Sequence, residues 1–149
     1  MSGTPDVAVR VVSYDDLDAR AAYALWRLRQ QVFVVEQASP YPDLDGRDLE
    51  ASTRHLLVED GHELVGCLRL LDEGDQARIG RVAVARTHRG RGVAAALMDR
   101  AMELVGERAV RLDAQTGLRE WYARYGFAVD GPEFIEDGVA HLPMARRRP

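Results

Sequence analysis

The pattern of apolar and polar residues along this chain switches several times between the period of a strand and that of a helix. Alternating, β-branched runs predict strands over 7–13, 54–59, 63–71, 77–85, 109–113, 127–129 and 140–145. Helical spacing predicts helices over 17–34, 92–100 and 118–125, the first of them capped by Asp15 or Asp16. The order β-α-β-β-β-α-β-α-β-β predicts an α+β fold with a mixed, mostly antiparallel central sheet flanked by helices.

Turn residues indicate how these elements connect. Asp60-Gly61 and Glu73-Gly74-Asp75 predict an antiparallel meander of three strands. The strand 77–85, the next helix and the strand 109–113 predict one parallel crossover, and a ligand is expected where the sheet opens beside it. The segment 36–50, which contains two prolines, predicts a structured loop with one short helical turn.

Glycine and arginine alternate where the strand 77–85 meets the following helix. The segment reads Arg86-Thr87-His88-Arg89-Gly90-Arg91-Gly92. Glycine lets backbone N–H groups approach a ligand, a helix N-terminus carries partial positive charge, and guanidinium groups match phosphate oxygens. The segment therefore predicts a pyrophosphate-binding loop. A plain strand-to-helix turn with solvated arginines is the alternative.

Composition removes several classes of function. All twenty basic residues are arginine, so a Walker A loop and a Schiff-base enzyme are excluded, because both need lysine. The net charge of −4 argues against nucleic-acid binding, and no apolar run reaches the length of a membrane span. A single cysteine, Cys67, indicates a reducing, cytoplasmic location. With 149 residues, the chain is expected to form one domain, 1–149.

The glycine loop also matches G-x-G-x-x-A, the dinucleotide-binding pattern, with Asp113 near the spacing of a ribose-binding acid. A dinucleotide fold begins with a β-α-β unit, whereas this loop follows a meander. That interpretation is therefore the weaker one.

Two sequence blocks resemble the GNAT family of N-acetyltransferases. The loop is similar to the family motif R/Q-x-x-G-x-G/A, and it follows a Val-Ala-Val strand. A second block, Trp121–Phe127, is similar to the family's aromatic-Tyr-x-x-x-Gly-Phe element, and Gln115 stands where that block commonly has asparagine. A narrower resemblance, to the ElaA-type subfamily, rests on 32–37, 40–45, 54–56 and 113–115.

The resemblance implies a GNAT-like fold and transfer of an acetyl group from acetyl-CoA to an amine. Backbone groups of Val82, Ala83 and Val84 would meet the pantetheine arm and the thioester, where an N–H stabilises the developing oxyanion. Tyr122 would be the general acid, with Glu36 a candidate base. The remaining cofactor-binding residues that the resemblance implies are Arg89, Gly90, Arg91, Gly92, Val93, Ala94 and Gln115.

Each of these residues has an ordinary structural alternative. Val82–Val84 could be only a core strand, Tyr122 a core aromatic residue, and Glu36 a solvated acid at a helix end. Cys67 lies mid-strand among apolar residues, which indicates a buried, inert thiol. No metal site is expected, because the acidic loop lacks the bidentate glutamate of a calcium site.

Acidic residues after the first helix suggest how an acceptor is bound. Asp43, Asp45 and Asp48 would attract a cationic amine, and His55 is a further substrate-binding candidate. The alternative is that the aspartates form Asx turns. The acceptor would be a small-molecule or peptide amine. The last hairpin, which ends in the predicted strand 140–145, offers a strand edge for pairing across a homodimer.

Two other functions stay open from the sequence. One is a module that binds acyl-CoA, or another partner, without turnover. The other is acyl-homoserine lactone synthesis, because Arg29–Glu36 (RQQVFVVE) faintly resembles the N-terminal motif of those enzymes.

Overall fold

The computed structural model describes residues 7–149, and the six residues before Val7 lie outside the description. The strands are β1 (Arg10–Val12), β2 (Arg54–Asp60), β3 (Glu63–Asp72), β4 (Gln76–Val84), β5 (Ala109–Gln115), β6 (Ala128–Val129), β7 (Phe134–Glu136) and β8 (Val139–Arg146). The helices are α1 (Ala19–Arg29), α2 (Val93–Val105) and α3 (Arg119–Ala123). Single 3₁₀ turns occur at Tyr14–Asp16, Arg47–Leu49, Arg86–His88 and Thr116–Leu118. None of the helices found from Val7 onward combines the length and apolar character needed to cross a membrane.

The strands form a mixed sheet in the order β1-β2-β3-β4-β5-β8-β6, with β7 paired to β8. Among the described strands every pairing is antiparallel except that of β4 with β5. This confirms the α+β fold, the meander and the single crossover through α2. It also excludes the dinucleotide fold, which needs a parallel sheet.

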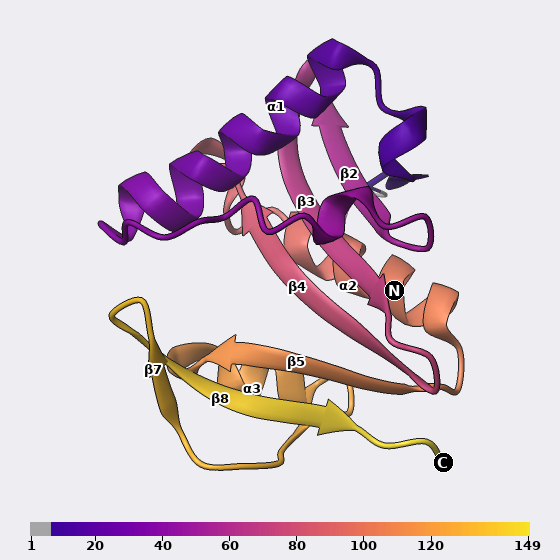
Figure 1. Ribbon diagram of the computed structural model, residues 1–149, viewed down its shortest axis with the longest axis vertical. Helices are drawn as coiled ribbons and strands as arrows, with labels where there is room; N and C mark the ends of the chain where they lie inside the picture. The colour runs from indigo at the N-terminus through magenta and orange to yellow at the C-terminus, as the bar shows by residue number, and fades with distance from the viewer. Residues whose placement is uncertain (1–6) are drawn as a thin grey trace.

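β4 and β5 pair only at their beginnings, over three residues each (Gln76–Arg78 with Ala109–Arg111). Beyond Arg78 the two strands diverge, and Figure 1 shows the wedge between them. Each strand leaves one edge without a strand partner along the wedge. The opening in the sheet therefore lies beside the crossover, as the sequence predicted.

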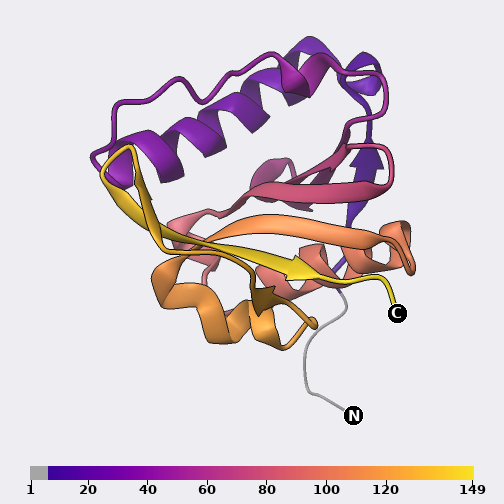
Figure 2. The same ribbon diagram turned by 60° about the horizontal axis from the view of Figure 1, so that its bottom comes forward.

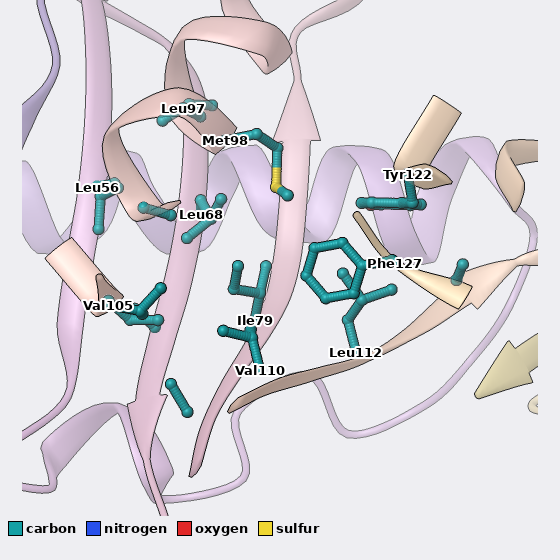
Figure 3. Packing of buried hydrophobic residues seen from close by; sticks show 14 of the residues in the cluster. Leu56, Leu68, Ile79, Leu97, Met98, Val105, Val110, Leu112, Tyr122 and Phe127 are labelled. Carbon is teal, nitrogen blue, oxygen red and sulfur yellow. The ribbon is translucent and has the colours of Figure 1, made fainter. Parts of the chain in front are cut away.

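Helices cover both faces of the sheet, with α1 on one side and α2 and α3 on the other (Figure 2). Alternate residues of each strand enter the two cores: Leu56 faces α2, for example, whereas Leu57 faces α1. The larger core lies under α2 (Figure 3) and extends to Tyr122 and Phe127 at one end. Burial on both faces explains the nearly continuous apolar runs of β2 (Leu56–Val58) and β3 (Val65–Leu71, except Arg69).

The first helix differs from its prediction at both ends. Asp15 and Asp16 belong to the 3₁₀ turn before it, so the predicted caps were wrong. Asp18 is the cap, because its carboxylate accepts the Ala21 N–H at 2.7 Å. After Arg29 the helix widens into a π-helical segment, Gln30–Glu36, which contains the β-branched residues Val32, Val34 and Val35.

Gly66 of β3 allows the close approach of α2. A Cβ built at this position would lie 2.4 Å from Val93 Cγ1 and 3.3 Å from Leu97 Cδ1. We expect Gly66→Ala to lower the free energy of unfolding by about 1–3 kcal/mol, because the added methyl group must push α2 away from the sheet. Urea denaturation measures the change. Gly117→Ala is the control, since a Cβ there meets nothing within 4 Å; equal losses in both variants would contradict the prediction.

Candidate active site

A cavity of about 750 Å³ opens where β4 and β5 diverge. Its walls come from both strands, the π-helical segment after α1, the glycine and arginine loop, α3 and the β7–β8 hairpin. Six of the predicted cofactor-binding residues line it: Val82, Ala83, Val84, Arg89, Ala94 and Gln115. Both proposed catalytic residues, Glu36 and Tyr122, line the same cavity.

β4 carries a β-bulge along this cavity. Cys67 pairs with Ala83 and Arg69 pairs with Gly80, so Arg81 and Val82 together lie opposite one residue of β3. Arg81 has φ +51°, a left-handed conformation that costs a residue with a Cβ roughly 1–2 kcal/mol and that glycine usually adopts in such bulges.

The bulge sets the direction of one peptide group. The Arg81 carbonyl oxygen accepts a weak hydrogen bond from Cys67 Sγ on β3, at 3.5 Å. The C=O and N–H of a trans peptide point in opposite directions, so the Val82 N–H points away from Cys67 Sγ. Val82 lines the cavity, so the bulge lies in the cavity wall.

The loop after β4 has the geometry of an anion site. Gly90 and Gly92 have φ +76° and +80°, and α2 begins at Val93 with no side-chain cap on its first N–H groups. Arg86 and Arg89 line the cavity, whereas Gly90, Arg91, Gly92 and Val93 follow them on the loop and at the start of α2. Backbone donors and guanidinium groups thus lie together at one end of the cavity.

Tyr122 lies in the wall of the cavity at the end of the α2-side core. Its ring packs edge-on against Trp121, with 5.0 Å between ring centroids. It also packs edge-on against Phe127, at 6.4 Å (Figure 3). Its side chain is 7% exposed, and its hydroxyl has no hydrogen-bond partner among residues 7–149. Burial, with a smaller contribution from Tyr125, raises the pKa of Tyr122 to about 12. The phenol therefore keeps its proton at neutral pH and can donate it.

Glu36 ends the π-helical segment and forms an ion pair with Arg89. Arg89 Nε also donates to the carbonyl oxygen of Val84, at 3.0 Å. One guanidinium thus connects the helix end, the end of β4 and the glycine loop. The Arg89–Glu36 pair joins residues 53 positions apart, and no sequence pattern indicated it.

The three aspartates of the acidic loop contact arginines of the protein itself. Arg29 donates to Asp43 Oδ2 at 2.8 Å and to Asp48 Oδ1 at 2.7 Å, and Arg69 donates to both oxygens of Asp45. Burial has the largest single effect on Asp45 and would raise its pKa, but the hydrogen bonds from Arg69 and from the Arg47 N–H, with the charges of Arg69 and Arg81, together outweigh it and lower that pKa to about 2. Since these charges are matched internally, the aspartates act as structural anchors of the loop, and they do not line the cavity.

His55 and Cys67 also lie outside the cavity lining. His55 is 1% exposed, packs edge-on to Trp26 and lies 3.3 Å from the Asp48 carbonyl oxygen, and burial lowers its pKa. Its burial makes it a packing residue of the α1 side, in place of the substrate contact suggested by the sequence. Burial raises the pKa of the Cys67 thiol to about 12, so it stays protonated and inert.

Sequence reasoning missed the partners of these aspartates: Arg29, Arg69 and Arg81. Arg29 is 1% exposed on the apolar face of α1, and Arg69 interrupts the apolar strand β3. A charged residue inside an apolar pattern is a signal of a buried ion pair. Applied to Arg29 and Arg69, that signal could have linked them to the acidic loop.

A comparison with known protein families gives the same classification as the fold and the sequence blocks. Residues 13–148 match the model of the acetyltransferase (GNAT) domain. The chain therefore belongs to the GNAT acetyltransferase family. Within that family it is ElaA-like, as the sequence blocks indicated.

Three relatives illustrate the extent of the similarity. A UPF0039 protein of Mycobacterium tuberculosis is 50% identical over 144 residues, which cover 93% of this chain and 92% of the relative. The crystal structure of an acyl-CoA N-acyltransferase from Pseudomonas aeruginosa is 37% identical with a TM-score of 0.89, covering 95% and 99% of the two chains. Escherichia coli ElaA is 36% identical with a TM-score of 0.88, covering 95% and 100%.

Proposed function

We propose that this protein is a single-domain N-acetyltransferase that transfers the acetyl group of acetyl-CoA to an amine by direct attack in a ternary complex. One observation carries the proposal. A single cavity is lined by the edge of β4 at its bulge, by two arginines of the glycine loop and by a protonated tyrosine. Family membership supports the acyl transfer, and the choice of acetyl and of an amine acceptor is our proposal.

The residues present suit this co-substrate. The N–H groups around Gly90 and Gly92, with Arg86 and Arg89, would hold the pyrophosphate. The pantetheine arm would lie along Val82–Val84, where β4 has lost its partner β5 and its backbone groups are available. The Val82 N–H would then donate to the thioester carbonyl as it becomes an oxyanion.

Two proton transfers accompany the reaction. The attacking amine must lose a proton, and the departing thiolate gains one. Tyr122 is proposed as the acid, because its raised pKa keeps it protonated and its hydroxyl is free to donate. Glu36 is proposed as the base, acting through a water, since its carboxylate lines the same cavity.

The experiment is a search for an acceptor. The purified protein is incubated with acetyl-CoA and a panel of small amines and peptides, and free thiol is measured. We expect thiol release that depends on the amine and exceeds hydrolysis without one. If acetyl-CoA raises the melting temperature but no amine or peptide supports release, the protein is a binding module and the proposal is wrong.

Gly92→Asp tests the cofactor site within the same experiment. A side chain at φ +80° brings both backbone strain and a carboxylate to the phosphate path, so the rise in melting temperature with acetyl-CoA should disappear. Gly74→Asp is the matched control, because Gly74 has φ +85° and lies in the distant β3–β4 turn. This control should keep the acetyl-CoA response.

A further inference from the structure

The side chain of Arg81 reaches back from the bulge of β4 to the acidic loop. Arg81 Nε lies 2.8 Å from Asp43 Oδ1, and its NH2 group donates to the Asp43 carbonyl oxygen at 3.0 Å. The guanidinium also lies over the Tyr41 ring, 5.6 Å from its centroid. Its NH2 group also donates to Asp45 Oδ2 at 3.4 Å. A residue in a conformation that favours glycine is thus held by contacts of its own side chain with the acidic loop.

Asp43, the residue that Arg81 binds, is itself held in place by other contacts. Arg29 donates to Asp43 Oδ2 at 2.8 Å and to the Asp43 carbonyl oxygen at 3.1 Å. Arg29 is 1% exposed and Asp43 9%, so water competes little for either group. Asp43 therefore fixes the Arg81 guanidinium relative to α1.

Without the contact between Arg81 and Asp43, β4 could adopt a conformation with less backbone strain, in which it pairs regularly with β3. A bulge displaces one residue relative to the neighbouring strand, and regular pairing would rotate the peptide between Arg81 and Val82. The Val82 N–H would then change direction.

We propose that Arg81 is a positioning residue for acyl transfer: its contact with Asp43 holds the bulge in the conformation that directs the Val82 N–H to the thioester carbonyl. The inference rests on the proposed function, in which that N–H stabilises the oxyanion. It also gives Asp43 a role in catalysis that does not involve contact with the acceptor.

The test compares Arg81→Gly, Arg81→Ala and the control Arg47→Ala. Glycine adopts φ +51° without strain but removes the contact with Asp43, whereas alanine removes that contact and keeps the strain. Arg47 belongs to the same loop and forms ion pairs with Glu50 and Glu73, outside the cavity lining. Readouts are kcat, the Kd of CoA by calorimetry, and the Val82 amide resonance by NMR.

We expect kcat to fall about tenfold or more in both Arg81 variants, part of the roughly 10²–10³-fold that loss of an oxyanion donor costs. The Kd of CoA should change about twofold or less, because the pyrophosphate loop is untouched, and the Val82 resonance should shift and broaden. Arg47→Ala should leave kcat and the resonance as in the wild type.

Several outcomes would overturn the proposal. If Arg81→Gly had the wild-type kcat, the contact with Asp43 would not be needed for turnover. The fall of kcat in Arg81→Ala would then come from backbone strain alone. An unchanged, sharp Val82 resonance in Arg81→Gly would show that the bulge holds without the contact with Asp43, whether or not turnover is detected. A parallel fall of kcat in Arg47→Ala would reduce the effect to general loosening of the loop. If the wild type lacks turnover while the resonance still broadens in Arg81→Gly, the proposed function fails and the role of the contact with Asp43 in holding the bulge stands.

Discussion

Tyr122→Phe is expected to lower kcat roughly 10²-fold or more, the usual range for loss of a general acid. The thiolate leaving group departs more easily when it is protonated, and the Tyr122 phenol, with its pKa near 12, carries a proton to give. Phenylalanine keeps the ring contacts with Trp121 and Phe127, so the fold and the Kd of CoA should not change. Single-turnover kinetics, thermal unfolding and calorimetry measure the three quantities.

Tyr125→Phe is the matched control for Tyr122. Tyr125 packs against Trp121 at 5.3 Å and is absent from the cavity lining, so removing its hydroxyl should change kcat little. A wild-type kcat in Tyr122→Phe, under conditions where chemistry limits the rate, would remove Tyr122 from the mechanism. Equal losses in the two variants would indicate an effect on the packing of α3 and leave no role for the Tyr122 proton.

Arg29→Met is expected to lower the free energy of unfolding by about 3–5 kcal/mol, the largest loss among the substitutions described. The guanidinium is 1% exposed and donates to both Asp43 and Asp48, so its removal takes one cation from each of two buried carboxylates and leaves Arg81 beside Asp43 and Arg69 beside Asp48. Methionine keeps much of the aliphatic volume, which limits the contribution from a cavity. For a protein of this size, the melting temperature should fall by roughly 6–20 °C.

An exposed ion pair provides the control for Arg29. Arg10 and Glu59 lie 3.2 Å apart with side chains 47% and 40% exposed, and Arg10→Ala should cost about 0–1 kcal/mol. A loss in Arg29→Met no larger than in Arg10→Ala would show that the buried carboxylates find other partners.

The pH dependence gives a second check on the buried charges. In the wild type, Asp45 and Asp48 have pKa values below the unfolded value of 3.8, for Asp45 about 2. Their stabilisation is therefore complete above about pH 4 and is lost as the pH falls toward 2. In Arg29→Met, protonation neutralises the carboxylates of Asp43 and Asp48, which have lost a cationic partner. The difference in unfolding free energy from the wild type should therefore shrink as the pH falls from 7 toward 4.

The expected site residues divide between those the structure brings together and those it does not. The cavity gathers Glu36, Tyr122, the β4 edge and the first part of the glycine loop, as the family resemblance implied. His55, Asp43 and Asp45 lie among buried arginines and aromatic rings of the α1 side. The family motifs identified residues that line one cavity, whereas the acidic loop by itself did not indicate which cations its aspartates would contact.

By itself, the sequence predicted most of the local elements and their order, but not the short strand β7 or the π-helical segment after α1. Periodicity identified the meander, the helix α2 and the turn of glycines before it, because burial on one or two faces and positive φ values leave a mark on neighbouring residues. Only the tertiary structure decided the bulge at Arg81, the Arg89–Glu36 pair and the arginine network around Asp43 and Asp48. These features join residues 14 to 53 positions apart, and which cation meets which anion depends on how α1 and the acidic loop pack over the sheet.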